Sequence, residues 1–162
     1  MSQVNDYYEP FDRALPLVYE GGFPRTILSL YRIGAEAGDA LSQYALGSLY
    51  LHGNKEMGIK VNTKMAIAYF RKAARTQCRA MFDMGVAYAA GNGVKKNQRT
   101  AFAWFSKAAA NGSIHAKLEV ARRKIFGEGT SRNIKQGRKL ERSASAQLAA
   151  FNACLNKPEP GA

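Results

Sequence analysis

Residues 80–112 read AMFDMGVAYAAGNGVKKNQRTAFAWFSKAAANG, and this stretch decides the fold class. On each side of a glycine turn, small and apolar residues recur with i, i+3, i+4, i+7 spacing, which is typical of one face of an amphipathic helix. They are Phe82, Gly85, Val86 and Ala89 before the turn, and Ala101, Trp104, Phe105 and Ala108 after it. The turn, residues 91–97, has glycines that can take positive φ and ends in Asn97, a favourable N-cap. The stretch therefore predicts two helices joined by a tight turn.

The same pattern recurs along the chain after a shift of about 36 residues. Residues 46–53 (LGSLYLHG) parallel residues 84–91 (MGVAYAAG), and residues 69–74 (YFRKAA) parallel residues 104–109 (WFSKAA). Residues 116–146 keep the glycines and the asparagine of the turn, but Lys124 stands where Tyr50 and Tyr88 stand upstream. A repeat with this period is the mark of an array in which neighbouring helix pairs stack to bury a shared core. We therefore predict an all-α superhelix, a solenoid that binds rather than catalyses.

The predicted domain organisation is one repeat domain over residues 12–156, with tails at residues 1–11 and 157–162. It comprises a partial repeat (12–39), two full repeats (40–77 and 78–113), a degenerate repeat (114–147) and a capping helix that continues to residue 156. This amounts to about 3.5–4 helix pairs. Residues 12–19 and 26–37 are the expected helices of the partial repeat. The loop of the first full repeat is longer than the others, and residues 54–58 form a surface insertion in it.

These motifs resemble the Sel-1-like repeat family, a branch of the tetratricopeptide superfamily, whose pattern is roughly A-x-x-x-L-G-x-x-Y-x-x-G-x-G-V-x-x-[DN]-x-x-x-A-x-x-W-F-x-K-A-A-x-x-G. The second full repeat carries it as Ala80, Met84, Gly85, Tyr88, Gly91, Gly93, Val94, Asn97, Ala101, Trp104, Phe105, Lys107, Ala108, Ala109 and Gly112. The resemblance covers about residues 12–146 and implies a right-handed superhelix of antiparallel helix pairs. It also implies an adaptor or scaffold, since many members are bacterial proteins of secretion, envelope and signalling systems. Some are immunity proteins that bind a cognate secreted toxin.

In the arrangement that this resemblance implies, the first helix of each repeat lines a concave groove. The residues expected there are Tyr44, Ser48, Leu51, Phe82, Asp83, Val86, Glu119 and Arg122. Tyr44 and Phe82 are the expected anchors, since aromatic side chains tend to dominate binding energy. The predicted function is thus a protein-interaction module that binds and regulates or neutralises a specific partner, for example a secreted toxin.

A second surface offers an alternative function, the binding of nucleic acid or another polyanion. Its residues are Arg123, Lys124, Lys135, Arg138, Lys139 and Arg142, the last four at i, i+3, i+4, i+7 spacing on one helix face. The simpler interpretation is the solvated face of a terminal helix. Nucleic acid is less favoured than an acidic protein, because no aromatic side chain alternates with the basic ones to stack on bases.

The net charge of +12 is unevenly distributed over the 162 residues. Residues 1–58 have 4 basic and 7 acidic side chains, whereas residues 59–162 have 20 basic and 5 acidic ones, which favours a partner with an acidic surface. No apolar run of about 18 residues is present, so we predict no membrane span. Residues 1–10 lack the basic-then-apolar pattern of an export leader, which predicts a cytoplasmic location, or a periplasmic one if a leader has been removed.

No motif for catalysis, a cofactor or a metal is recognisable, and we expect no enzyme. The glycines of residues 91–93 belong to a repeat turn and not to a phosphate loop. His52 and His115 have no carboxylate or cysteine at ligand spacing. Asp83 and Glu119 share one register position, and we interpret them as solvated groups or partner contacts in preference to a catalytic carboxylate pair. The cysteines at positions 78 and 154 are expected to be free thiols, with a bridge or a redox role as the alternative.

Overall fold

The computed structural model describes residues 23–155, and the side chains of residues 23–153. Within this range every regular element is a helix, apart from one isolated β-bridge between Asn54 and Ile59. The helices are α2 (Pro24–Glu36), α3 (Ala40–His52), α4 (Thr63–Ala73), α5 (Cys78–Ala90), α6 (Gln98–Ala110), α7 (Ile114–Phe126) and α8 (Ile134–Leu155). The expected helix over residues 12–19 lies outside the described residues, and the helix expected over residues 26–37 is α2.

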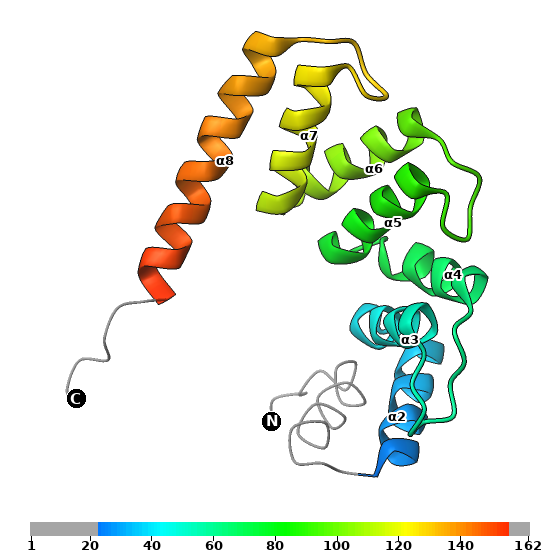
Figure 1. The fold of residues 1–162 in the computed structure, drawn as a ribbon. Helices are drawn as coiled ribbons and strands as arrows, with labels where there is room; N and C mark the ends of the chain where they lie inside the picture. Colours follow the sequence, from blue (N-terminus) through cyan, green and yellow to red (C-terminus); the bar gives the residue numbers. More distant parts are fainter. Residues whose placement is uncertain (1–22, 156–162) are drawn as a thin grey trace, which may run out of the picture.

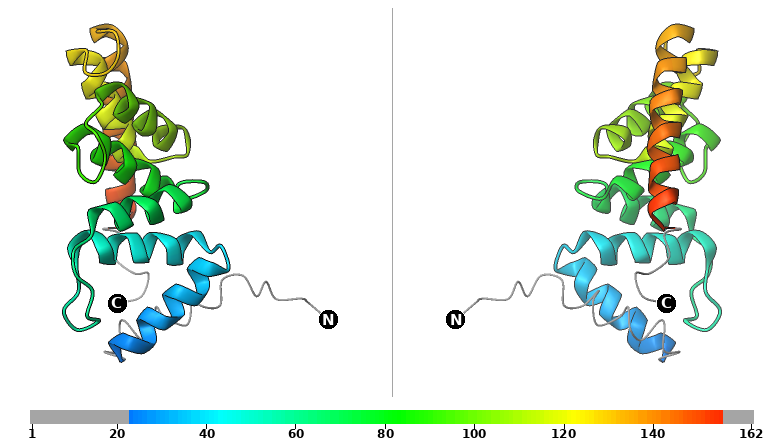
Figure 2. Two further views of the ribbon diagram at one scale, coloured as in Figure 1. Left: turned by 90° about the vertical axis from the view of Figure 1, so that its right-hand side faces the viewer. Right: turned by 90° about the vertical axis from the view of Figure 1, so that its left-hand side faces the viewer.

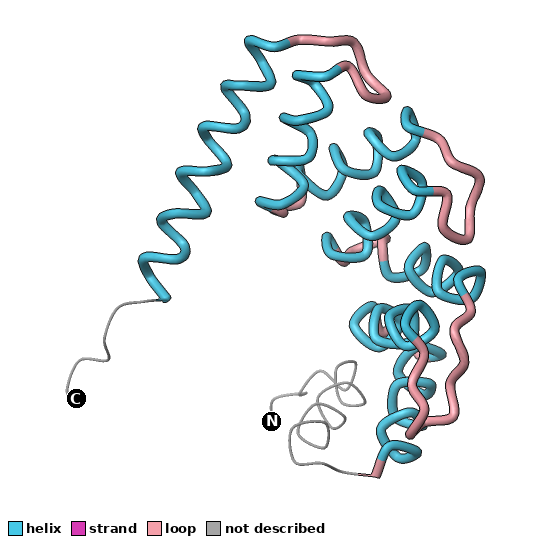
Figure 3. Tube along the Cα trace, in the orientation of Figure 1, coloured by secondary structure: helices cyan, strands magenta, loops and turns pink. Residues whose placement is uncertain are grey.

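The helices stack in sequence order into a curved and twisted array (Figures 1 and 2), and each packs on the next. In Figure 2, α3 runs across the view whereas α7 and α8 run up it, so successive pairs turn relative to one another. The loops that join the two helices of each pair, residues 53–62, 91–97 and 127–133, follow one another along one edge (Figure 3). This arrangement confirms the all-α repeat superhelix predicted from the sequence.

The loop inside each helix pair is held by the same bonds in every repeat. Asn62, Asn97 and Asn133 cap the second helices, because each Oδ1 accepts a hydrogen bond from the backbone N–H three residues on, at 3.0, 3.0 and 2.9 Å. Their own backbone N–H groups donate to the carbonyls of residues 50, 88 and 124 in the first helices, at 2.7–2.8 Å. The N-cap predicted at Asn97 is therefore confirmed, and it recurs with the repeat.

Close packing inside each pair depends on a glycine. A Cβ atom on Gly85 would lie 2.7 Å from the Phe105 ring, and one on Gly47 would lie 2.6 Å from the corresponding ring of the preceding repeat. In the third pair Ala121 occupies this register position, and the glycine has moved to the facing helix. A Cβ atom on Gly137 would lie 2.8 Å from the Ala121 carbonyl oxygen. The small residues thus set the distance between paired helices.

Helix α8 continues past the repeat that it completes. Ala144 is fully buried, and the Gln147 side chain accepts a hydrogen bond from Lys117 Nζ at 2.9 Å, so the first part of α8 covers α7. The last turns extend past the N-terminal end of α7 (Figure 1), and Phe151 is 56% exposed. The capping helix predicted to reach residue 156 is α8, which the structure describes as far as Leu155, and only its first part covers α7. No helix within residues 23–155 has the length and apolar character needed to cross a bilayer.

Candidate partner-binding face

The residues predicted for a groove lie on α3, α5 and α7, and we call their common surface the first-helix face. It comprises Tyr44, Ser48, Leu51, Phe82, Asp83, Val86, Glu119 and Arg122. None of these side chains is fully buried, and Val86 is 41% exposed. Hydrogen bonds join Tyr44 of α3 to Asp83 of α5, and Arg122 to Glu119 within α7.

Tyr44 and Asp83 form a hydrogen-bonded pair between two repeats. Tyr44 Oη donates to Asp83 Oδ2 at 2.9 Å, and the Tyr44 ring packs on Phe70 with 5.5 Å between centroids. Burial, followed by the neighbouring Asp83 carboxylate, raises the pKa of Tyr44 to about 12, so the phenol stays a neutral donor. Burial also raises the pKa of Asp83, against the lowering effects of the Tyr44 bond and the Arg79 guanidinium. The pair therefore ties neighbouring repeats together on this face.

A hollow of about 460 Å³ lies between α5 and α7, and we call it the distal hollow. Phe82 and Val86 form its apolar wall, and the buried Phe105 ring lies edge-on to Phe82 at 5.2 Å. Glu119 and Arg122 lie on its charged side. Apolar surface beside a polar rim is the usual composition of a protein interface.

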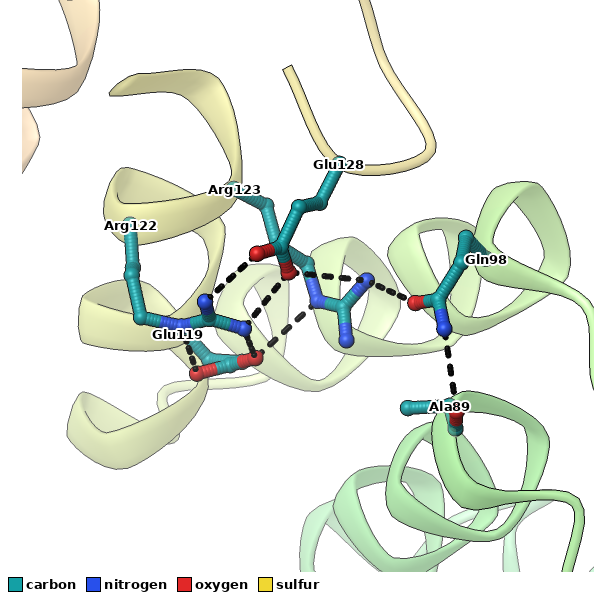
Figure 4. Close-up of polar contacts among 6 residues, drawn as sticks. All are labelled: Ala89, Gln98, Glu119, Arg122, Arg123 and Glu128. Atoms are coloured by element: carbon teal, nitrogen blue, oxygen red, sulfur yellow. Dashed lines mark hydrogen bonds and ion pairs between the residues drawn. The ribbon is translucent and has the colours of Figure 1, made fainter. Parts of the chain in front are cut away.

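The charged side of the distal hollow is a network of ion pairs (Figure 4). Glu119 Oε1 accepts hydrogen bonds from Arg122 Nη2 at 2.8 Å and from Arg123 Nε at 3.0 Å. Glu128, in the loop after α7, accepts two hydrogen bonds from Arg122 at 2.9 and 2.8 Å. The bonds from Arg122 lower the pKa of Glu119 and of Glu128 against the opposing effect of burial. Both carboxylates are therefore charged at neutral pH.

Arg123 belongs to this network and not to the exposed basic surface on which we predicted it. Its side chain is 3% exposed, and Nη1 donates to Gln98 Oε1 at 2.8 Å. The guanidinium carbon lies 4.9 Å from the centre of the Phe105 ring. Arg123 is buried because a carboxylate, an amide and a ring face together compensate for its loss of water.

The other residues of the predicted basic face are more accessible. Lys135, Arg138, Lys139 and Arg142 are exposed on α8 and line a broad hollow of about 900 Å³. Lys124 in α7 is half-buried, with Nζ 5.5 Å from the centre of the Phe102 ring. None of these five takes part in the ion pairs formed within residues 23–153. The four basic side chains on α8, which we call the α8 stripe, therefore present positive charge that is unpaired within residues 23–153.

A further hollow, of about 570 Å³, lies on the α2–α3 side of the Tyr44–Asp83 pair, and we call it the proximal hollow. Ser48 of α3 lines it, as do Met57 of the longer loop and Arg79 of α5. Leu51, in contrast, packs against the core. Neither Met57 nor Arg79 was predicted for this face. The insertion in the first repeat was the signal that could have pointed to Met57.

Within residues 23–153, no three histidine, cysteine or acidic side chains gather as a metal site would require. His52 lies at the end of α3 with Nδ1 3.0 Å from the Ser48 carbonyl oxygen, and His115 is exposed in the first turn of α7. Cys78 is a free, half-buried thiol, and the side chain of Cys154 lies outside the described part of the chain.

The Sel1 repeat family model matches residues 40–75, 78–113 and 114–147. Among solved structures, a Sel1 repeat protein from Oxalobacter formigenes is 31% identical with a TM-score of 0.68, over 76% of this chain and 90% of that one. The protective antigen c5321 of uropathogenic Escherichia coli, which displays an SLR fold, is 26% identical with a TM-score of 0.79, over 87% of this chain and 30% of the antigen. Cysteine-rich protein B of Helicobacter pylori is 23% identical with a TM-score of 0.58, over 81% of this chain and 92% of that one, and this likeness concerns the fold alone. No curated protein sequence matches the chain.

Proposed function

Because the chain belongs to the Sel1 repeat family, whose repeats are protein-interaction scaffolds, we propose that it holds a protein partner along the first-helix face. The observation that carries this proposal is the pair of hollows on that face, of about 570 and 460 Å³, on either side of the Tyr44–Asp83 link. Each combines apolar side chains with an arginine, and aromatic residues and arginine are enriched where protein interfaces are most buried.

The charge of the chain supports a partner with an acidic surface. The net charge is +12, and a potential of this sign accelerates association with an acidic protein and disfavours a basic one. Arg79 places part of this charge on the first-helix face, beside the proximal hollow, whereas Glu119 and Glu128 pair with Arg122 at the distal hollow.

The experiment begins with capture of the partner by a tagged chain from an extract of the source organism, treated with nuclease. Val86→Glu then introduces a negative charge, the same sign as the acidic partner surface, into the distal hollow. It should weaken binding of the captured protein by about tenfold or more. Ala103→Glu, at an exposed position on α6, is the matched control and should bind normally. Equal binding by the two variants would show that the partner does not use this face. Tyr44 and Phe82 are less suitable for substitution, because both rings pack on core phenylalanines.

A finer form of this function is the neutralisation of a secreted toxin, as the resemblance to immunity-type family members suggests. The captured partner should then arrest growth when it is expressed alone, and co-expression of the chain should restore growth. The Val86→Glu chain should fail to restore it. Growth that is unaffected by the partner alone would exclude this form and leave the scaffold function standing.

The α8 stripe favours a second candidate function, the binding of a polyanion. Its side chains are exposed and unpaired within the described residues. If they contact phosphates, affinity for a random-sequence duplex DNA should fall steeply between about 50 and 200 mM salt. Reversal of Arg138, Lys139 and Arg142 to glutamate should abolish binding. Retained binding by that variant would rule out the α8 stripe as the site.

A further inference from the structure

The loop of the first helix pair, residues 53–62, is three residues longer than loops 91–97 and 127–133, and the extra length forms an ordered turn. Asn54 and Ile59 exchange two backbone hydrogen bonds at 2.8 Å, and Asn54 Oδ1 accepts a third from the Met57 N–H at 2.8 Å. Ile59 is 8% exposed and belongs to the same buried cluster as Ile27 and Leu28 of α2. Met57 packs against that cluster. The inserted turn is therefore a fixed part of the fold.

The inserted turn supplies one wall of the proximal hollow. Met57 lies on this wall, and Ala45 and Leu49 of α3 also line the space. The volume of about 570 Å³ falls within the range of about 300–1,000 Å³ that is usual for binding pockets. Loops 91–97 and 127–133 lack the extra residues, so a wall of this kind is particular to the first repeat. Its apolar lining suits a large apolar side chain.

The charge at this pocket comes from Arg79. Its guanidinium carbon lies 6.0 Å from the centre of the Tyr44 ring, and Arg79 has no hydrogen bond or ion pair with any other residue in the described part of the chain. Among residues 23–153, no aspartate or glutamate lines the pocket. Asp83, one turn further along α5, is outside the lining and accepts the Tyr44 hydrogen bond. The pocket rim therefore offers a guanidinium that is free to bind a carboxylate.

Comparison with the distal hollow shows that the Arg79 guanidinium lacks a carboxylate partner within the described residues. There the chain itself provides the carboxylates, since Glu119 and Glu128 bind Arg122 at 2.8 Å each, and Glu119 also binds Arg123. At the proximal hollow no residue within the described part of the chain forms such an ion pair with Arg79, whose charge acts on Asp83 without a direct bond. A partner that brings a carboxylate would complete an equivalent pair, and the aromatic ring of Tyr44 beside it would strengthen the bond by excluding water.

We infer that the proximal hollow receives an extended segment of a protein partner that carries a large apolar side chain next to an aspartate or glutamate. The apolar side chain enters against Met57 and Leu49, and the carboxylate binds Arg79. This inference rests on the proposed function and adds to it the chemistry of the segment that is recognised. It also assigns a role to the inserted turn, which forms the pocket that distinguishes one partner from another.

The test is selection of a phage-displayed library of random dodecapeptides on the full chain. The selected peptides should share an aspartate or glutamate within two positions of a large apolar residue. Fluorescence anisotropy with a synthetic copy of the best peptide then compares variants. Arg79→Glu should weaken binding by about tenfold or more, and Met57→Ser by about fivefold, because the first reverses the charge and the second removes apolar contact. Ala103→Glu, at the exposed position on α6, is the matched control and should change the affinity less than about twofold.

Three results would overturn the inference: selected peptides without an acidic residue, unchanged affinity in the Arg79→Glu chain, or no selected peptide at all. If Val86→Glu still releases the captured partner in those cases, the scaffold function stands and only the pocket assignment fails. If neither Val86→Glu nor Arg79→Glu affects the partner, both are wrong. Thermal unfolding of each variant identifies loss of fold, and the exposed Arg79 decides the matter if Met57→Ser is unstable.

Discussion

Substitution of Arg123 by methionine tests the network that shapes the distal hollow. The side chain is 3% exposed and bonds to Gln98 at 2.8 Å and to Glu119 at 3.0 Å, and methionine keeps most of its length. A hydrogen bond to a charged group contributes about 1.5–3 kcal/mol, and two such bonds are lost. Glu119 keeps its bond to Arg122, so no further cost of an unpaired buried charge is added. The two lost bonds together contribute about 3–6 kcal/mol, and we expect the free energy of unfolding to fall by about 3 kcal/mol, the lower end of this range, because methionine keeps most of the packing.

The neighbouring arginine provides the control for this prediction. Arg122 binds the same carboxylate of Glu119, but its side chain is 43% exposed, and exposed ion pairs contribute about 0–1 kcal/mol. Urea unfolding followed by far-ultraviolet circular dichroism should therefore show a clearly larger loss for Arg123→Met than for Arg122→Met. Equal losses, or a larger one for Arg122→Met, would refute the reasoning that burial makes Arg123 the structural member of the pair.

Three further predictions concern packing, capping and pH. Gly85→Ala should lower the free energy of unfolding measured with urea, because its Cβ would lie 2.7 Å from the Phe105 ring. The cost of overpacking, about 1–3 kcal/mol, exceeds the gain of about 1 kcal/mol in helix propensity. The same substitution should cost less in a Phe105→Leu background, and an equal cost there would point to another cause. Asn97→Ala should cost about 1 kcal/mol and Asn97→Ser much less, because serine also caps α6; equal costs would contradict the capping role. The folded-state pKa values of Glu119 and Glu128 lie below the ordinary 4.5, so the stability that their ionisation contributes is complete at neutral pH and is lost as pH falls through those values. The unfolding temperature should therefore drop below pH 4.5, and the drop should be smaller in the Glu128→Gln chain. The same drop in that variant would argue against the ion pairs.

The helices and their order could be predicted from the sequence because the determinants are local. Asn97 marks the start of α6, and the glycines of residues 91–93 mark the end of α5, so spacing alone fixed both boundaries within a residue or two. Gly47 and Gly85 align with one another in the sequence repeat, and each lies directly beneath a phenylalanine ring of the facing helix.

The contacts between repeats were harder to predict, because they depend on residues far apart in sequence. Tyr44 and Asp83 were both expected on the first-helix face, yet only the structure shows their hydrogen bond across 39 residues. Arg123 was predicted on the basic face together with Lys124, and its burial against Gln98 was not visible from helical spacing.

The proximal hollow shows the same limit for loops. The insertion after α3 was recognised from its length, but its packing onto the fold depends on Ile59. The burial of Ile59 beside α2 could not be predicted from the repeat spacing. Arg79 enters the site for a related reason, since the position of its helix relative to the inserted turn is a product of stacking and not of local pattern.

Hydrogen–deuterium exchange of the chain, alone and with its captured partner, tests the central claim most directly. If the first-helix face holds the partner, slower exchange should be concentrated in residues 40–52, 78–90 and 114–126, which form α3, α5 and α7. The inserted turn at residues 54–59 should be protected with them. Protection confined to α4, α6 and α8, with α3, α5 and α7 unchanged, would contradict the account and move the binding surface to the other side of the array.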